Sequence, residues 1–200
     1  MTRVYLEVGA RKVFACALDW PGWCRAGKGE EAALSALASY ATRYAAAAAR
    51  AGVVFDGEQE AAHLDVVERV KGSATTDFGA LDAVPEVDRS SGTDGADART
   101  VALVRAAWDS LDAAAATAPQ ALRKGPRGGG RDRDAVVQHV METELLHARM
   151  LGIKKTDQAR ADLLAAIEAG GSPMIPFVAR RTAWHALDHA WEIEDRTELA

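Results

Sequence analysis

The 200-residue chain carries 24 Lys and Arg against 29 Asp and Glu, which gives a net charge of −5 and disfavours a general nucleic-acid binder or binding to an anionic membrane surface. No stretch approaches the roughly 20 apolar residues of a membrane helix. The N-terminus enters a strand-like pattern without a basic, apolar leader, so we expect a cytoplasmic protein without a signal peptide.

The first third of the chain predicts a small α+β unit. Residues 4–8 and 12–18 alternate β-branched or aromatic residues with others, which predicts a β-hairpin. Acidic residues open an alanine-rich stretch over 30–50, and Gly52 follows it, as expected of a helix. Residues 64–70 alternate again, which predicts a third strand and a β-β-α-β order over residues 1–72.

The segment between hairpin and helix contains a Pro-Gly loop. It reads Asp19-Trp20-Pro21-Gly22-Trp23, then Gly27, then Glu30-Glu31-Ala32-Ala33-Leu34. With the β-β-α-β order, this resembles the HicB-like domain, although Trp23 stands where that family has a cysteine. No helix-turn-helix or ribbon-helix-helix segment follows, so the resemblance implies a fold rather than an antitoxin activity.

The second half predicts four helices after a linker over 73–96 that is rich in Gly, Ser, Thr and Asp. The expected helices run from 98 to before Pro119, from Asp132 or Asp134 to Leu151, from Thr156-Asp157 to 169, and from about 177 to 197. Four amphipathic helices pack most simply as a bundle over 97–200. The predicted fold class is therefore α+β, a small N-terminal domain followed by an all-α bundle.

Three histidines form the first candidate site. His185 and His189 are four residues apart on the fourth predicted helix, a spacing at which both can bind one ion. His139 stands among apolar residues of the second predicted helix and is expected to face the interior. From the residues alone, these side chains are either metal ligands or core histidines with internal hydrogen bonds.

The arrangement of four helices, with one histidine on the second and H-x-x-x-H on the fourth, resembles the DinB-like superfamily. The resemblance implies a divalent metal ion, zinc, nickel or iron(II), on His139, His185 and His189. Several members act with low-molecular-weight thiols in transfer or isomerisation, so such a thiol is a second candidate cofactor.

Charged residues near the histidines suggest supporting roles. Glu142, Asp188 and Glu192 are candidate partners for ring N–H groups, or else solvated carboxylates. Two other histidines are less promising: His147, two turns beyond His139, is a weaker candidate ligand, and His63 is expected at the surface.

A glycine-rich basic segment precedes the second predicted helix. Lys124, Arg127 and Arg131 surround its glycines, and Arg181 lies one turn before His185. Free N–H groups at a helix N-terminus favour anions, so these four residues are candidate anion-binding groups; the alternative is a solvated loop.

Together these features favour a metal-dependent enzyme that activates a thiol or water towards a small anionic substrate, as a transferase, isomerase or hydrolase. No general acid or nucleophile stands out. The alternative is a non-enzymatic binding or regulatory protein that uses the HicB-like domain for a protein partner. A homodimer is compatible with either.

Overall fold

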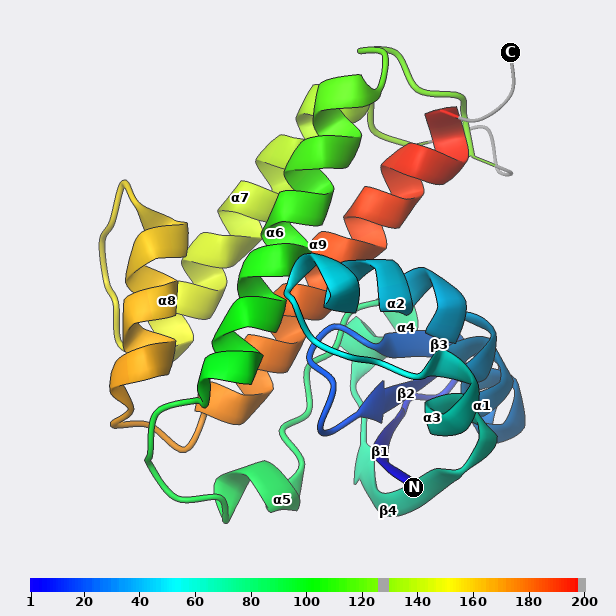
Figure 1. The fold of residues 1–200 in the computed structure, drawn as a ribbon, viewed down its shortest axis with the longest axis vertical. Coiled ribbons are helices and arrows are strands. Elements are labelled where there is room, and N and C mark those ends of the chain that lie inside the picture. Colours follow the sequence, from blue (N-terminus) through cyan, green and yellow to red (C-terminus); the bar gives the residue numbers. More distant parts are fainter. Residues whose placement is uncertain (126–129, 198–200) are drawn as a thin grey trace.

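The computed structural model describes residues 1–125 and 130–197, in which a mixed sheet with helices precedes a helical region (Figure 1). The α+β class predicted from the sequence is confirmed. The strands are β1 (Thr2–Val8), β2 (Val13–Ala17), β3 (Cys24–Gly27) and β4 (Leu64–Lys71). The helices are α1 (Glu30–Ser39), α2 (Ala41–Arg50), α3 (Gly57–Ala62), α4 (Ala74–Phe78), α5 (Glu86–Arg89), α6 (Ala98–Thr117), α7 (Arg133–Met150), α8 (Ala159–Ala169) and α9 (Ile175–Thr197).

The sheet has the order β3-β2-β1-β4, with β1 antiparallel to β2 and parallel to β4. The predicted hairpin and third strand are confirmed. Strand β3 was not predicted, because four residues are too short to show alternation and only their pairing with β2 defines the strand. The single helix predicted over 30–50 is two helices, which meet at Tyr40, where φ is −90° and ψ is 0°.

The central strand β2 is buried on both faces, whereas the edge strand β4 exposes alternate residues. Ala15 and its alternate neighbours pack in the same apolar cluster as Leu37 of α1 and Tyr44 of α2. Phe14 faces the other way and meets the Trp184 ring of α9 edge-on, at 5.4 Å between centroids. Because side chains of a strand alternate between faces, the sheet is a middle layer between α1–α2 and α9.

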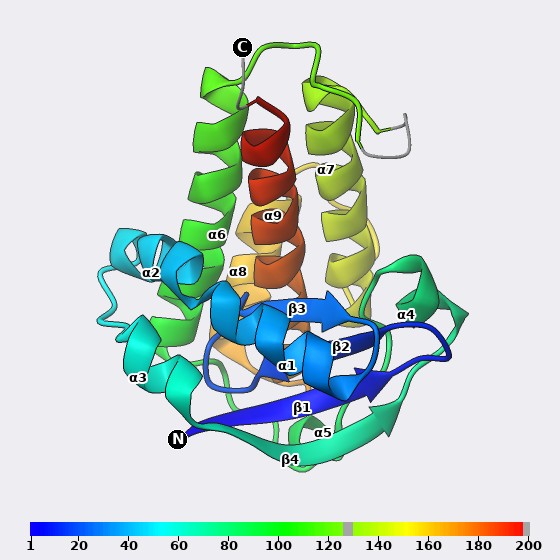
Figure 2. The same cartoon turned by 90° about the vertical axis from the view of Figure 1, so that its right-hand side faces the viewer.

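Helix α9 is enclosed between α6 and α7 (Figure 2). Fifteen of its 23 residues are buried, too many for the single apolar stripe expected of a surface helix. Four of them, Arg180, Thr182, His185 and Arg196, are polar and must find partners in the interior. None of the helices in the described ranges combines the length and hydropathy needed to cross a membrane.

The segment predicted as a linker, 73–96, contains α4 and α5 and is tied to both halves of the chain. The buried Glu7 carboxylate of β1 accepts hydrogen bonds from the Thr76 hydroxyl and from the backbone N–H groups of Asp82 and Ala83. Asp88 forms a buried ion pair with Arg180 of α9. Burial raises the pKa of Asp88 despite this pairing, so the cost of desolvating the carboxylate outweighs the attraction of Arg180.

Replacing one partner of this ion pair is expected to destabilise the fold. Arg180→Met leaves the Asp88 carboxylate buried without its cation, which costs about 3–5 kcal/mol. Denaturant unfolding of Arg180→Met, with Arg69→Met of the exposed Arg69–Glu30 pair as control, measures this loss. The double variant Arg180→Met/Asp88→Leu should recover most of it, and equal midpoints for Arg180→Met and wild type would contradict the expectation.

Candidate metal centre

The three predicted histidines converge where α7 packs against α9. His139, His185 and His189 each offer a ring nitrogen, and these atoms all lie within 4.8 Å of one another. The ring centroids form a nearly regular triangle, with His139 5.1 Å from each of the other two and 4.6 Å between His185 and His189. The chain thus contains a candidate three-histidine metal site in its helical region.

Local sequence explains why the rings meet. Four residues separate His185 from His189, slightly more than one helical turn, so both rings leave the same face of α9. Val136 and Val140, which flank His139 on α7, are buried in an apolar cluster with Ile193 of α9. Packing of this cluster fixes the rotation of α7 and turns His139 towards α9.

Burial keeps two of the three rings, His139 and His185, neutral. It lowers the pKa of His185 to about 2, with smaller contributions from the neighbouring histidines and Arg181. Burial also lowers the pKa of His139, and the charge of Arg131 acts in the same direction. A metal ligand must be an unprotonated imidazole, so at neutral pH His139 and His185 are already in the form that an ion requires.

Glu192 orients one of the rings. Its carboxylate lies 2.8 Å from Nδ1 of His189 and also accepts a hydrogen bond from Arg196 at 2.7 Å. Hydrogen bonding to His189 lowers the pKa of Glu192, so the carboxylate is ionised and Nδ1 is the donor. Nε2 of His189 then carries the free lone pair, as in the carboxylate–histidine pairs of known metal sites.

The residues present fit a divalent ion. Nδ1 of His185 is buried without a hydrogen-bond partner, an arrangement that costs free energy and that an ion in the cluster would offset by engaging the ring. Imidazole nitrogen suits zinc, nickel and iron, and three such ligands leave a coordination position for water or substrate.

The other two predicted carboxylate partners bond elsewhere. The Asp188 carboxylate lies 2.6 Å from the Arg25 guanidinium, so it links α9 to β3. Glu142 is exposed and accepts a hydrogen bond from Gln138 on the same helix.

The two remaining histidines have contrasting surroundings. His147 is buried, with Nδ1 2.9 Å from the Thr182 hydroxyl and with its ring centroid 6.2 Å from that of His185. His63 is exposed, as expected, and its carbonyl accepts a hydrogen bond from Thr2 of β1.

The predicted anion-binding residues do not gather at one place. Lys124 lies 3.7 Å from Asp132, and Arg127 lies outside the described residues. Arg131 is exposed near His139. Arg181 instead lies near His147, which is about two helical turns further along α7 than His139. The basic segment and Arg181 therefore flank the cluster from different sides.

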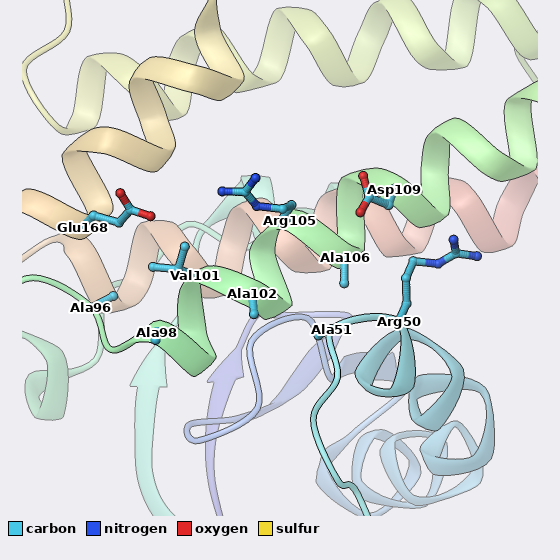
Figure 3. A pocket seen from close by; sticks show the side chains of 10 residues that line it. All are labelled: Arg50, Ala51, Ala96, Ala98, Val101, Ala102, Arg105, Ala106, Asp109 and Glu168. Atoms are coloured by element: carbon cyan, nitrogen blue, oxygen red, sulfur yellow. The ribbon is translucent and has the colours of Figure 1, made fainter.

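Two surface grooves lie away from the histidines. One, of about 490 Å³, has a floor of alanines and Val101 between α6, α2 and α8, with Arg50, Arg105, Asp109 and Glu168 around it (Figure 3). Another, of about 570 Å³, runs along α7 and the start of α8 and is lined by Glu142. Neither groove is lined by a histidine, so neither gives access to the candidate site.

Two polar residues of α9 were not predicted from the sequence: Arg196, which donates to Glu192, and Thr182, which is hydrogen-bonded to His147. With His185, His189 and Glu192 they recur every three or four residues along one face of α9. A polar stripe at helical spacing within an otherwise apolar helix is the signal that could have identified them.

No protein-family model, no curated protein and no solved structure matches the chain. The family resemblances drawn from the sequence therefore stay predictions. The geometry of the histidine cluster is the feature of the molecule that points to a function.

Removing the charge of Glu192 is expected to weaken metal binding. Glu192→Gln replaces the carboxylate that stabilises the Nδ1–H tautomer of His189 with a neutral amide. Loss of such a partner lowers metal affinity about 10–100-fold. Zinc affinity can be measured by competition with a chromophoric chelator, with the exposed Glu142→Gln as matched control. Equal affinities for Glu192→Gln and the control would show that Glu192 does not support the site.

Proposed function

We propose that the protein is a metal-dependent enzyme of DinB-like type, in which His139, His185 and His189 hold one divalent ion that serves catalysis. The observation that carries the proposal is the convergence of three histidine rings from two helices, with their ligand atoms within 4.8 Å. A low-molecular-weight thiol or water is the group to be activated, and the reaction is a transfer, isomerisation or hydrolysis of a small anionic substrate.

A divalent ion with an open coordination position supplies a Lewis acid and lowers the pKa of a bound water or thiol. The chain's own part is to hold the ligands and limit access. Glu192 keeps His189 in the required tautomer, and Arg196 holds Glu192 by donating one hydrogen bond to its carboxylate and another to the Arg123 carbonyl. These bonds tie the ligand helix to the segment that connects α6 to α7.

Apolar packing next to the rings excludes water from one side of the site. Leu111 of α6, Val136 and Val140 of α7, and Ala190 and Ile193 of α9 form one buried cluster. In such surroundings the interaction of an ion with a bound anion is stronger than in water. The setting favours activation of a bound nucleophile over exchange with solvent.

Elemental analysis of untagged protein, purified without chelator, tests the site. We expect about one zinc, nickel or iron ion per chain. The double variant His185→Ala/His189→Ala should lose the ion, because a single imidazole cannot hold it. Circular dichroism checks that the variant is folded, and Arg105→Met on the outer face of α6 is the matched control.

Wild-type protein without metal, even after reconstitution with each of the three ions, would exclude the proposal. Metal retained by the double variant would show that the ion binds elsewhere. With the site established, cobalt(II)-loaded protein distinguishes the two nucleophiles, since a thiol bound to cobalt gives a sulfur-to-metal charge-transfer band and water does not.

A further inference from the structure

The guanidinium of Arg181 is half-buried and has no oxygen partner within residues 1–125 and 130–197. Nη1 of this guanidinium lies 3.9 Å from Sδ of Met150, and its Cζ lies 5.8 Å from the centroid of the Phe177 ring. A thioether and an aromatic ring are weak partners for a guanidinium, which has five N–H donors. Burial lowers the pKa of Arg181, because its charge has lost water without gaining a bonded anion.

Every other arginine that is buried or half-buried within 1–125 and 130–197 donates to an oxygen. These residues are Arg25, Arg43, Arg99, Arg133, Arg160, Arg180 and Arg196. The carboxylates that act on Arg181 from a distance, Glu7 and Asp82, are hydrogen-bonded to residues of the 73–96 segment. Arg181 therefore differs from these seven arginines, each of which donates a hydrogen bond to an oxygen.

His147 provides a second unmet donor nearby. Its ring is buried, Nδ1 lies 2.9 Å from the Thr182 hydroxyl, and Nε2 has no hydrogen-bond partner. The Thr182 hydroxyl makes no other hydrogen bond in the described part of the chain, so we assign it as the donor to Nδ1, which places the ring hydrogen on Nε2. Burial lowers the pKa of His147 to about 3, which keeps the ring neutral.

The two donors come from facing turns of antiparallel helices. On α7, Met150 follows His147 by three residues and contacts Arg181; on α9, Thr182 is next to Arg181 and contacts His147. The charge of Arg181 contributes to the lowered pKa of both His147 and His185. The unmet donors thus lie together, beside the three-histidine cluster and on the side away from the basic segment.

We propose that Arg181 and His147 form a carboxylate-binding subsite next to the histidine cluster, so that the substrate is a small carboxylic acid with its reacting group directed towards the ion. This inference rests on the proposed function for the reaction, although the subsite itself is built from residues outside the ligand set. The guanidinium fork matches a carboxylate, and Nε2–H of His147 supplies a further hydrogen bond.

The surroundings favour a carboxylate over a phosphate. A carboxylate carries one charge, which one guanidinium compensates, whereas a phosphate dianion needs additional donors or cations. The remaining contacts of Arg181, Met150 and Phe177, offer neither. Filling the subsite with a carboxylate gives Arg181 the oxygen partner that each of the other enclosed arginines has within the protein.

The test is a titration of the whole protein with propionate, with neutral propionamide and inorganic phosphate as comparison ligands. Calorimetry or histidine-side-chain NMR follows binding in the metal-free and zinc-loaded protein. We expect propionate to bind in preference to both comparison ligands, and Arg181→Met to weaken it by about tenfold or more, the effect of one charge-assisted pair. Arg181→Lys, which keeps the charge but loses the fork, should fall between, and exposed Arg105→Met should bind as wild type.

Thermal unfolding provides an independent readout. Because Arg181 has no anion to leave behind, Arg181→Met should melt no lower than wild type in the absence of ligand, and propionate should raise the melting temperature of wild type alone. This behaviour distinguishes an arginine held for a ligand from one with a structural role.

The outcomes separate this inference from the proposed function. If the protein takes up no metal but binds propionate in a manner that depends on Arg181, the subsite is supported and the proposed metal-dependent reaction is excluded. Metal binding with propionate affinities equal in wild type and Arg181→Met would overturn the subsite and leave the metal centre intact. Absence of propionate binding, or tighter binding of phosphate, would also overturn it.

Discussion

The rest of the structure depends on the enclosure of α9. A helix packed by α6, α7 and the sheet cannot send its polar side chains to water, so each of them needs a partner inside the protein. Arg180 forms an ion pair with Asp88, Arg196 forms one with Glu192, and Thr182 is hydrogen-bonded to His147. The Arg180–Asp88 and Thr182–His147 pairings attach α9 to the connecting segment and to α7, whereas Arg196–Glu192 lies within α9.

Some interior groups keep no partner within residues 1–125 and 130–197. Two of these buried atoms, Nδ1 of His185 and Nε2 of His147, lie at the α7–α9 interface, where Arg181 also lacks an oxygen partner. Buried polar groups without partners are rare because they are costly. Their proximity at this interface is the physical reason for placing both a metal ion and a carboxylate there.

The N-terminal half contributes to this site through packing. The sheet lies against α9 through Phe14 and Trp184, and Arg25 of β3 forms an ion pair with Asp188 between the two ligand histidines His185 and His189 in sequence. Trp20 in the loop before β3 lies under the Arg99 guanidinium of α6. Because one apolar core runs from the sheet into the helices, the position of α9 depends on both halves of the chain.

The sequence by itself determined the α+β class, most of the strands and long helices, and the three histidines, because period-2 and period-3.6 patterns and an i, i+4 pair are local properties. Tertiary structure alone decided that β2 is buried on both faces, that β3 pairs with β2, and that Glu192 rather than Asp188 supports a histidine. It also decided that Arg181 has no acidic partner in the part of the chain that the structure describes. Pairing and desolvation depend on residues distant in sequence, such as Arg25 and Asp188, which no local pattern relates to each other.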